Sequence, residues 1–76
     1  MNGPEQNSEV AQLRERIALE YEAAQRGLSG TAQGTAQHAF ITRRLESMAD
    51  HYRELKQLIG EHKAINILMD VLEQSH

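Results

Sequence analysis

The segment from residue 35 to residue 59 carries the longest amphipathic pattern in this chain. Its apolar side chains recur every three or four residues, which is the spacing that places them on one face of an α-helix. The members of this stripe are Ile41, Leu45, Met48, Tyr52, Leu55 and Ile59. We therefore expect one long helix over 35–59 whose apolar face must be covered by another part of the fold.

A second stripe with the same spacing precedes it and predicts a helix over about 9–26. Ser8 is a suitable N-cap residue, and Gly27 stands where glycine commonly terminates a helix. The apolar positions of this stripe are Val10, Leu13, Ile17, Tyr21, Ala24 and Leu28. Residues 1–8 have no such periodicity and contain glycine and proline, so we expect a disordered N-terminal tail followed by a single helical domain over 9–74.

Three glycines separate the two stripes and argue against one continuous helix. Gly27, Gly30 and Gly34 each disfavour a helix by about 1 kcal/mol relative to alanine. The last two also begin a direct repeat of Gly-Thr-Ala-Gln, in which Thr31 or Thr35 could cap the next helix. Because the separating segment is as short as the usual connection between neighbouring helices, we expect the two long helices to form an antiparallel hairpin.

The last segment, 61–73, follows Gly60 and has a broader apolar surface than the other two. On a helix its apolar residues span an arc of about 200°, roughly twice the arc that packing against one neighbour covers. The central positions of this arc are Ile65, Leu68, Met69 and Leu72, and we expect them to lie in a subunit interface. The predicted fold is thus all-α, with an antiparallel helical hairpin and a short third helix that completes a bundle as a homo-oligomer, most simply a twofold dimer.

Size and composition exclude several classes of protein. The chain has 76 residues, which is close to the lower limit at which one core supports a fold without disulfides, metal or a partner. It contains no cysteine, so disulfides and zinc–thiolate sites are excluded. No apolar run approaches the ~20 residues of a membrane span, and the polar N-terminus does not resemble a signal peptide. We therefore expect a cytoplasmic protein that does not act in a membrane.

Glu20 and His38 are the candidate polar or ligand-binding site. Counting back three positions from Ile41 places His38 on the apolar face of its helix, near the turn. In an antiparallel hairpin it lies close to the level of Ala24 and within one turn of Glu20. A hydrogen bond between the two side chains would satisfy two partly buried polar groups, and we favour this interpretation. A metal-binding or ligand-binding bundle is the alternative, but it needs further ligands from a second chain, so we expect no cofactor.

The charge pattern argues against nucleic-acid binding. The net charge is -3, and the eight Lys and Arg residues are interspersed with eleven Asp and Glu. A helix-turn-helix around Gly60 is an alternative. Its recognition helix would present Lys63, Asn66 and Asp70 to the solvent, with little positive charge for phosphate contacts.

No residue pattern typical of an active site is found in this sequence. Ser29, Thr31 and Thr35 are the hydroxyl residues nearest to His38 along the chain, but none stands in a Gly-x-Ser-x-Gly motif. We therefore do not expect an enzyme. The sequence instead favours a small helical protein–protein interaction or assembly module, which acts through its apolar helix faces on a second copy or on another protein.

Overall fold

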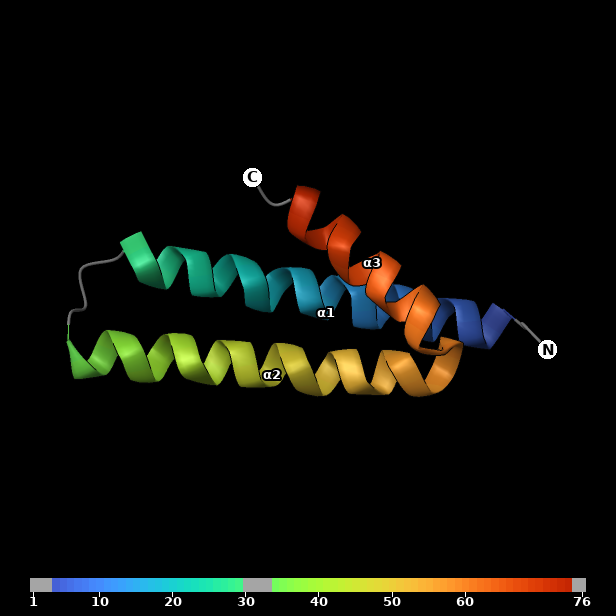
Figure 1. Ribbon diagram of the computed structural model, residues 1–76, viewed down its shortest axis with the longest axis horizontal. Helices are drawn as coiled ribbons and strands as arrows, with labels where there is room; N and C mark the ends of the chain where they lie inside the picture. Colours follow the sequence, from blue (N-terminus) through green and yellow to red (C-terminus); the bar gives the residue numbers. More distant parts are fainter. Residues whose placement is uncertain (1–3, 30–33, 75–76) are drawn as a thin grey trace.

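The computed structural model describes residues 4–29 and 34–74. Within these ranges the chain forms three α-helices and no strand: α1 (Pro4–Ser29), α2 (Thr35–Ile59) and α3 (Glu61–Gln74). Figure 1 shows α1 and α2 side by side in antiparallel directions, with the shorter α3 crossing the hairpin at one end. The all-α prediction of a helical hairpin with a short third helix is therefore confirmed for the described residues.

Helix α1 is longer than predicted at both ends. It begins at Pro4, so the helix includes residues 4–8, where the sequence predicts a tail; residues 1–3 lie outside the described residues. Proline is favoured in the first helical turn, because its missing N–H has no partner there and its φ angle is already helical. At the other end the helix continues through Gly27 to Ser29, so Gly27 does not terminate it.

The start of α2 is fixed by Gly34 and by side-chain contacts with the end of α1. Gly34 has φ 66° and ψ -134°, a conformation that favours glycine, and no side chain caps the helix. Thr35 is the first helical residue and not the cap, while Thr31 lies outside the described residues. The side-chain amide of Gln37 donates hydrogen bonds to the carbonyl oxygens of Gly27 at 2.8 Å and Leu28 at 3.2 Å. These bonds satisfy carbonyl groups that the end of α1 would otherwise leave unpaired.

A single residue, Gly60, connects α2 to α3. Its φ of 88° lies in the region that favours glycine, and a side chain added there would meet no atom within 4 Å. Its N–H donates to the carbonyl oxygen of Lys56 at 2.8 Å, and its own carbonyl accepts a hydrogen bond from Ala64 N–H at 3.0 Å. The chain therefore changes direction within one residue while its hydrogen bonding continues.

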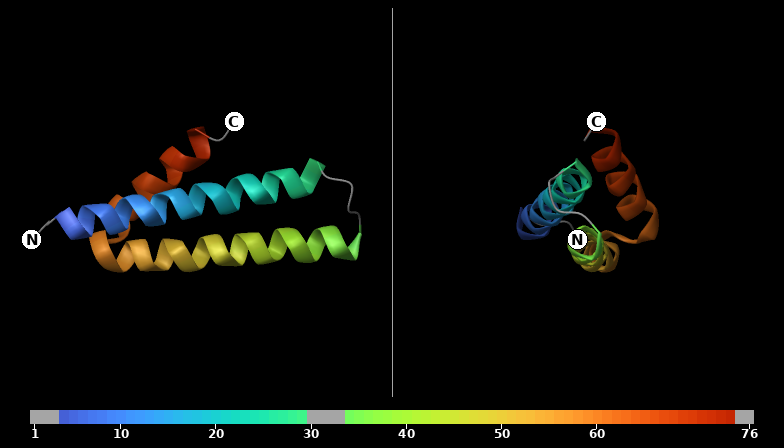
Figure 2. Two further views of the ribbon diagram at one scale, coloured as in Figure 1. Left: turned by 180° about the vertical axis from the view of Figure 1, so that it is seen from behind. Right: turned by 90° about the vertical axis from the view of Figure 1, so that its left-hand side faces the viewer.

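The hydrophobic core lies at one end of the hairpin. Its buried members come from all three helices and are Leu13, Ile17, Leu55, Ala64 and Val71. The half-buried residues packed against them are Val10, Ala18, Met48, Tyr52, Leu58, Ile59, Ile67 and Leu68. We call 19–29 of α1 and 35–47 of α2 the elbow half of the hairpin. It contributes no member to this cluster, and Ala24 is the one residue described there that is buried. Figure 2 shows the reason, since α3 flanks only the end at which α1 begins and α2 ends.

Candidate interaction surfaces

The apolar residues of α3 divide into an inner and an outer group. Ala64 and Val71 are buried in the core of the same chain, and Ile67 and Leu68 pack against it. The outer group consists of Ile65, which is 44% exposed, Met69, which is 53% exposed, and the half-buried Leu72. These three follow one another at intervals of four and three residues, so they form a continuous edge of the helix. We call them the α3 edge.

Of the four residues predicted to form an interface, Leu68 therefore has a different role from the others. It packs against the core of its own chain. Ile65 and Met69, which are neighbours on the helix, leave about half of their surfaces in solvent. Packing within one chain thus covers only part of the broad apolar arc on 61–73.

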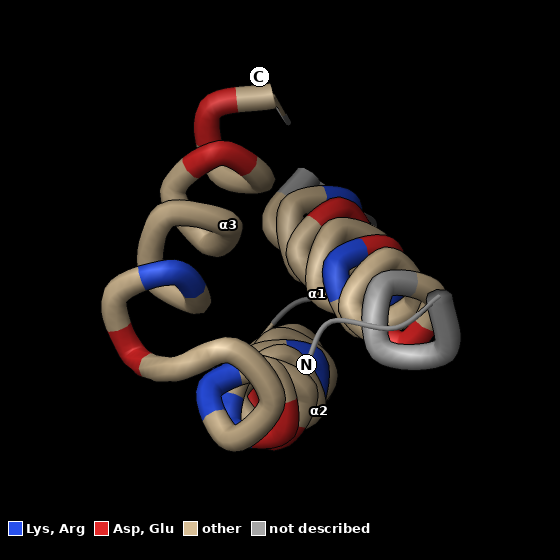
Figure 3. The backbone as a smooth tube through the Cα atoms, turned by 90° about the vertical axis from the view of Figure 1, so that its right-hand side faces the viewer, with Lys and Arg blue, Asp and Glu red and all other residues tan. Residues whose placement is uncertain are grey.

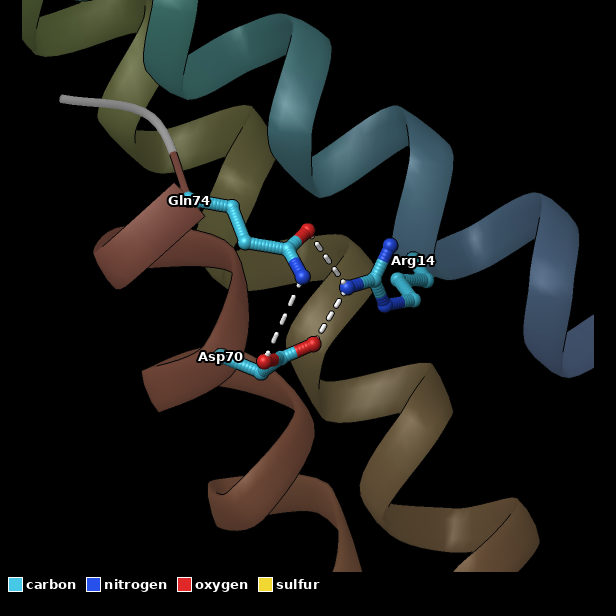
Figure 4. A network of polar contacts seen from close by, with 3 residues as sticks. All are labelled: Arg14, Asp70 and Gln74. Atoms are coloured by element: carbon cyan, nitrogen blue, oxygen red, sulfur yellow. Dashed lines mark hydrogen bonds and ion pairs between the residues drawn. The ribbon is translucent and has the colours of Figure 1, made fainter.

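A polar network holds the opposite edge of α3 against α1 (Figure 4). One guanidinium nitrogen of Arg14 forms an ion pair with Asp70 and donates a hydrogen bond to the amide oxygen of Gln74 at 3.0 Å. Asp70 and Gln74 are one turn apart on α3, and the Gln74 amide also approaches Asp70 at 3.5 Å. Because the side chains are exposed, the ion pair is worth only about 0 to 1 kcal/mol. It links the side of α3 that carries Asp70 and Gln74 to α1, and it involves none of the three residues of the α3 edge.

A second exposed apolar surface lies on the elbow half. Leu28 is 68% exposed and Leu45 is 42% exposed, while Tyr21 and Ile41 are half-buried. We call these four residues the elbow face. Residues seven apart on a helix differ in direction by only about 20°, so positions on successive turns can be compared by their spacing.

This spacing places the elbow face in line with the surface that α3 covers. Tyr21 and Leu28 follow Arg14, which contacts α3, at successive intervals of seven. Leu45 precedes Tyr52, which packs against the core, by the same interval. The elbow face therefore continues the docking surface of α3 along the hairpin, beyond the end of that helix.

The candidate site at Glu20 and His38 is not formed as predicted. Glu20 is largely buried and pairs with Arg44, whose guanidinium donates a 3.0 Å hydrogen bond to its carboxylate, whereas His38 is exposed. Arg44 also lies over the ring of Phe40, 5.7 Å from the ring centre. In the part of the chain that the structure describes, no group of three or more His, Asp or Glu side chains could hold a metal ion.

The helix-turn-helix alternative finds no specific geometric support. Helices of that motif are joined by a turn of about three or four residues, whereas Gly60 alone connects α2 and α3. Lys63 is the one Lys or Arg residue of α3, which also carries Glu61, Asp70 and Glu73. Figure 3 shows charges of both signs on the helices.

None of the described helices combines the length and apolarity that crossing a membrane requires. No protein family model matches the sequence, and neither a curated protein nor a solved structure is significantly similar to it. The function must therefore be inferred from the two apolar surfaces, the α3 edge and the elbow face.

Proposed function

We propose that the protein is a small helical assembly module that forms a homodimer through the α3 edge. The observation that carries this proposal is the exposure of Ile65 and Met69 on a helix whose inner apolar residues already fill the core. Burying such side chains yields about 25 cal/mol for each Å² of apolar surface removed from water. A twofold axis lets the same patch serve both chains, so no second partner is required.

The small core supports the same proposal. Only six hydrophobic residues are buried in the described chain, and two of them are alanines. Proteins of this size bury a smaller fraction of their surface on folding than larger proteins do, and those without disulfides or metal commonly gain stability by oligomerisation. Assembly through the α3 edge would add large side chains to the buried set of each chain.

Charge substitutions on the α3 edge test the proposal. Met69→Glu places a carboxylate in the proposed interface, and because Met69 is 53% exposed in the single chain, the substitution leaves the core of the subunit intact. We expect the dimer dissociation constant to rise by at least a hundredfold, since a buried unpaired charge costs several kcal/mol. Asn66→Glu, which changes an exposed residue of the same helix by the same charge, is the matched control and should dimerise as the wild type does.

Leu68→Glu is a poor test of assembly. Leu68 packs against the core, so its replacement by glutamate would unfold the single chain whether or not the protein dimerises.

Equal dimerisation by Met69→Glu and the wild type would contradict a role for the α3 edge.

A further inference from the structure

The elbow half of the hairpin lacks the third helix that covers the other half. Of its described residues only Ala24 is buried, and alanine contributes little apolar area. Two helices packed side by side bury one stripe each, and apolar residues beside that stripe stay in the solvent unless another element covers them. In the elbow half this uncovered surface is the elbow face.

The length of the elbow half fits α3 itself. Helix α3 has 14 residues, which corresponds to roughly 21 Å at 1.5 Å per residue. Segment 35–47 of α2 corresponds to roughly 20 Å on the same scale. The elbow half of the hairpin is therefore about as long as α3.

The exposed area of the chain also points to a second copy. The chain exposes 5485 Å², whereas a folded monomer of 8.6 kDa exposes about 4,700 Å². The difference is roughly 800 Å², which is similar in size to the area that each partner buries in an interface of standard size. The radius of gyration is 13.8 Å, compared with about 11.4 Å for a compact domain of this length, so the surplus accompanies an elongated shape.

We propose that the elbow face is the surface on which α3 of the second copy docks. This inference rests on the proposed function and assigns the surface that receives the α3 edge. A twofold axis perpendicular to the length of the hairpin places the elbow half of one chain opposite the end of the other chain that carries α3. Each α3 then lies against the elbow half of its partner. Both exposed apolar surfaces are then covered by one symmetric contact, in which Met69 of each subunit lies near Leu45 of its partner.

Disulfide trapping tests this arrangement directly, because the chain has no cysteine of its own. Leu45→Cys and Met69→Cys chains are mixed, refolded together and oxidised. A disulfide requires Cα atoms within about 7 Å, so a covalent heterodimer between the two variants reports their proximity. Leu19→Cys is the control partner, because Leu19 is 52% exposed and, two positions after the fully buried Ile17, points to nearly the opposite side of α1.

We expect the Leu45→Cys and Met69→Cys mixture to give at least ten times more cross-linked heterodimer than the Leu19→Cys and Met69→Cys mixture. Equal yields from the two mixtures would overturn the inference. So would a Met69→Cys homodimer as the dominant product, because it would show that two α3 edges face each other. That result would leave the proposed function standing.

A charge substitution on the elbow face separates the two proposals a second time. Leu45→Glu should raise the dimer dissociation constant at least tenfold, and Leu19→Glu, which makes the same change on the opposite face, should leave it unaltered. If Leu45→Glu dimerises with the wild-type constant while Met69→Glu does not, the inference fails and the proposed function holds. If the wild type is itself a monomer, both fail.

Discussion

Gly27 has a packing role that its low helix propensity does not suggest. Glycine lowers helix stability, yet Gly27 lies within the last turn of α1. A Cβ atom there would lie 2.8 Å from Cδ1 of Phe40 and 3.2 Å from Cγ1 of Ile41. The absence of a side chain thus permits the close approach of α1 and α2 at the elbow. In the sequence alone the same glycine suggests a helix end.

A double-mutant cycle separates these two effects at Gly27. We expect Gly27→Ala to lower the free energy of unfolding by about 1 kcal/mol, because the clash outweighs the gain in helix propensity. In a Phe40→Ala background the same substitution should be neutral or stabilising by up to about 1 kcal/mol, since the nearest atoms are gone. Urea unfolding of the four proteins measures both values. An identical effect in the two backgrounds would contradict the packing role of Gly27.

Glu20 and His38 differ in burial, and their substitutions should differ accordingly. Glu20→Ala removes the partner of Arg44 from a largely buried position, so we expect a loss of about 1 to 2 kcal/mol in the free energy of unfolding. His38→Ala alters an exposed residue and should change it by less than about 0.5 kcal/mol. Thermal or urea unfolding distinguishes the two. A larger loss for His38→Ala than for Glu20→Ala would restore the original interpretation of His38 as a buried polar group.

At the scale of helices, periodicity predicts well where the chain is helical and less well which side faces inward. Helix α2 spans the predicted 35–59, and α3 extends only one residue beyond the predicted 61–73. The inward face of α2, however, includes Arg44, while Leu45 is 42% exposed. Position 44 fits the three-and-four spacing between Ile41 and Met48 as well as position 45 does. Hydrophobic periodicity assigns the inward position to Leu45. Arg44 can take that position only because it pairs with Glu20 on another helix.

The small number of buried residues in the elbow half predicts uneven protection of the backbone. In a monomeric variant such as Met69→Glu, amides of 19–29 and 35–47 should exchange with deuterium faster than those around Leu13, Ile17 and Leu55, because few buried contacts oppose local opening. In the wild-type protein, where we propose that α3 of a second copy covers the elbow half, this half should gain protection. Hydrogen exchange followed by mass spectrometry measures both states, and equal protection of the elbow half in the two would contradict its coverage by a partner.

At the scale of the whole molecule, the candidate surfaces could be predicted only in part. The excess apolar arc on 61–73 was visible in the sequence, because helical geometry alone defines it. The elbow face was not, because Leu28 and Leu45 belong to stripes that read as core positions. Only the placement of α3 over one half of the hairpin shows that these side chains remain exposed.

Sedimentation equilibrium of the wild-type protein tests the central claim, that two copies assemble through their exposed apolar surfaces. At micromolar concentration we expect a single species of twice the 8.6 kDa chain mass. This mass should persist when salt is raised to about 1 M, because salt screens charges and does not weaken apolar contacts. A folded 8.6 kDa monomer with helical circular dichroism under the same conditions would contradict the account.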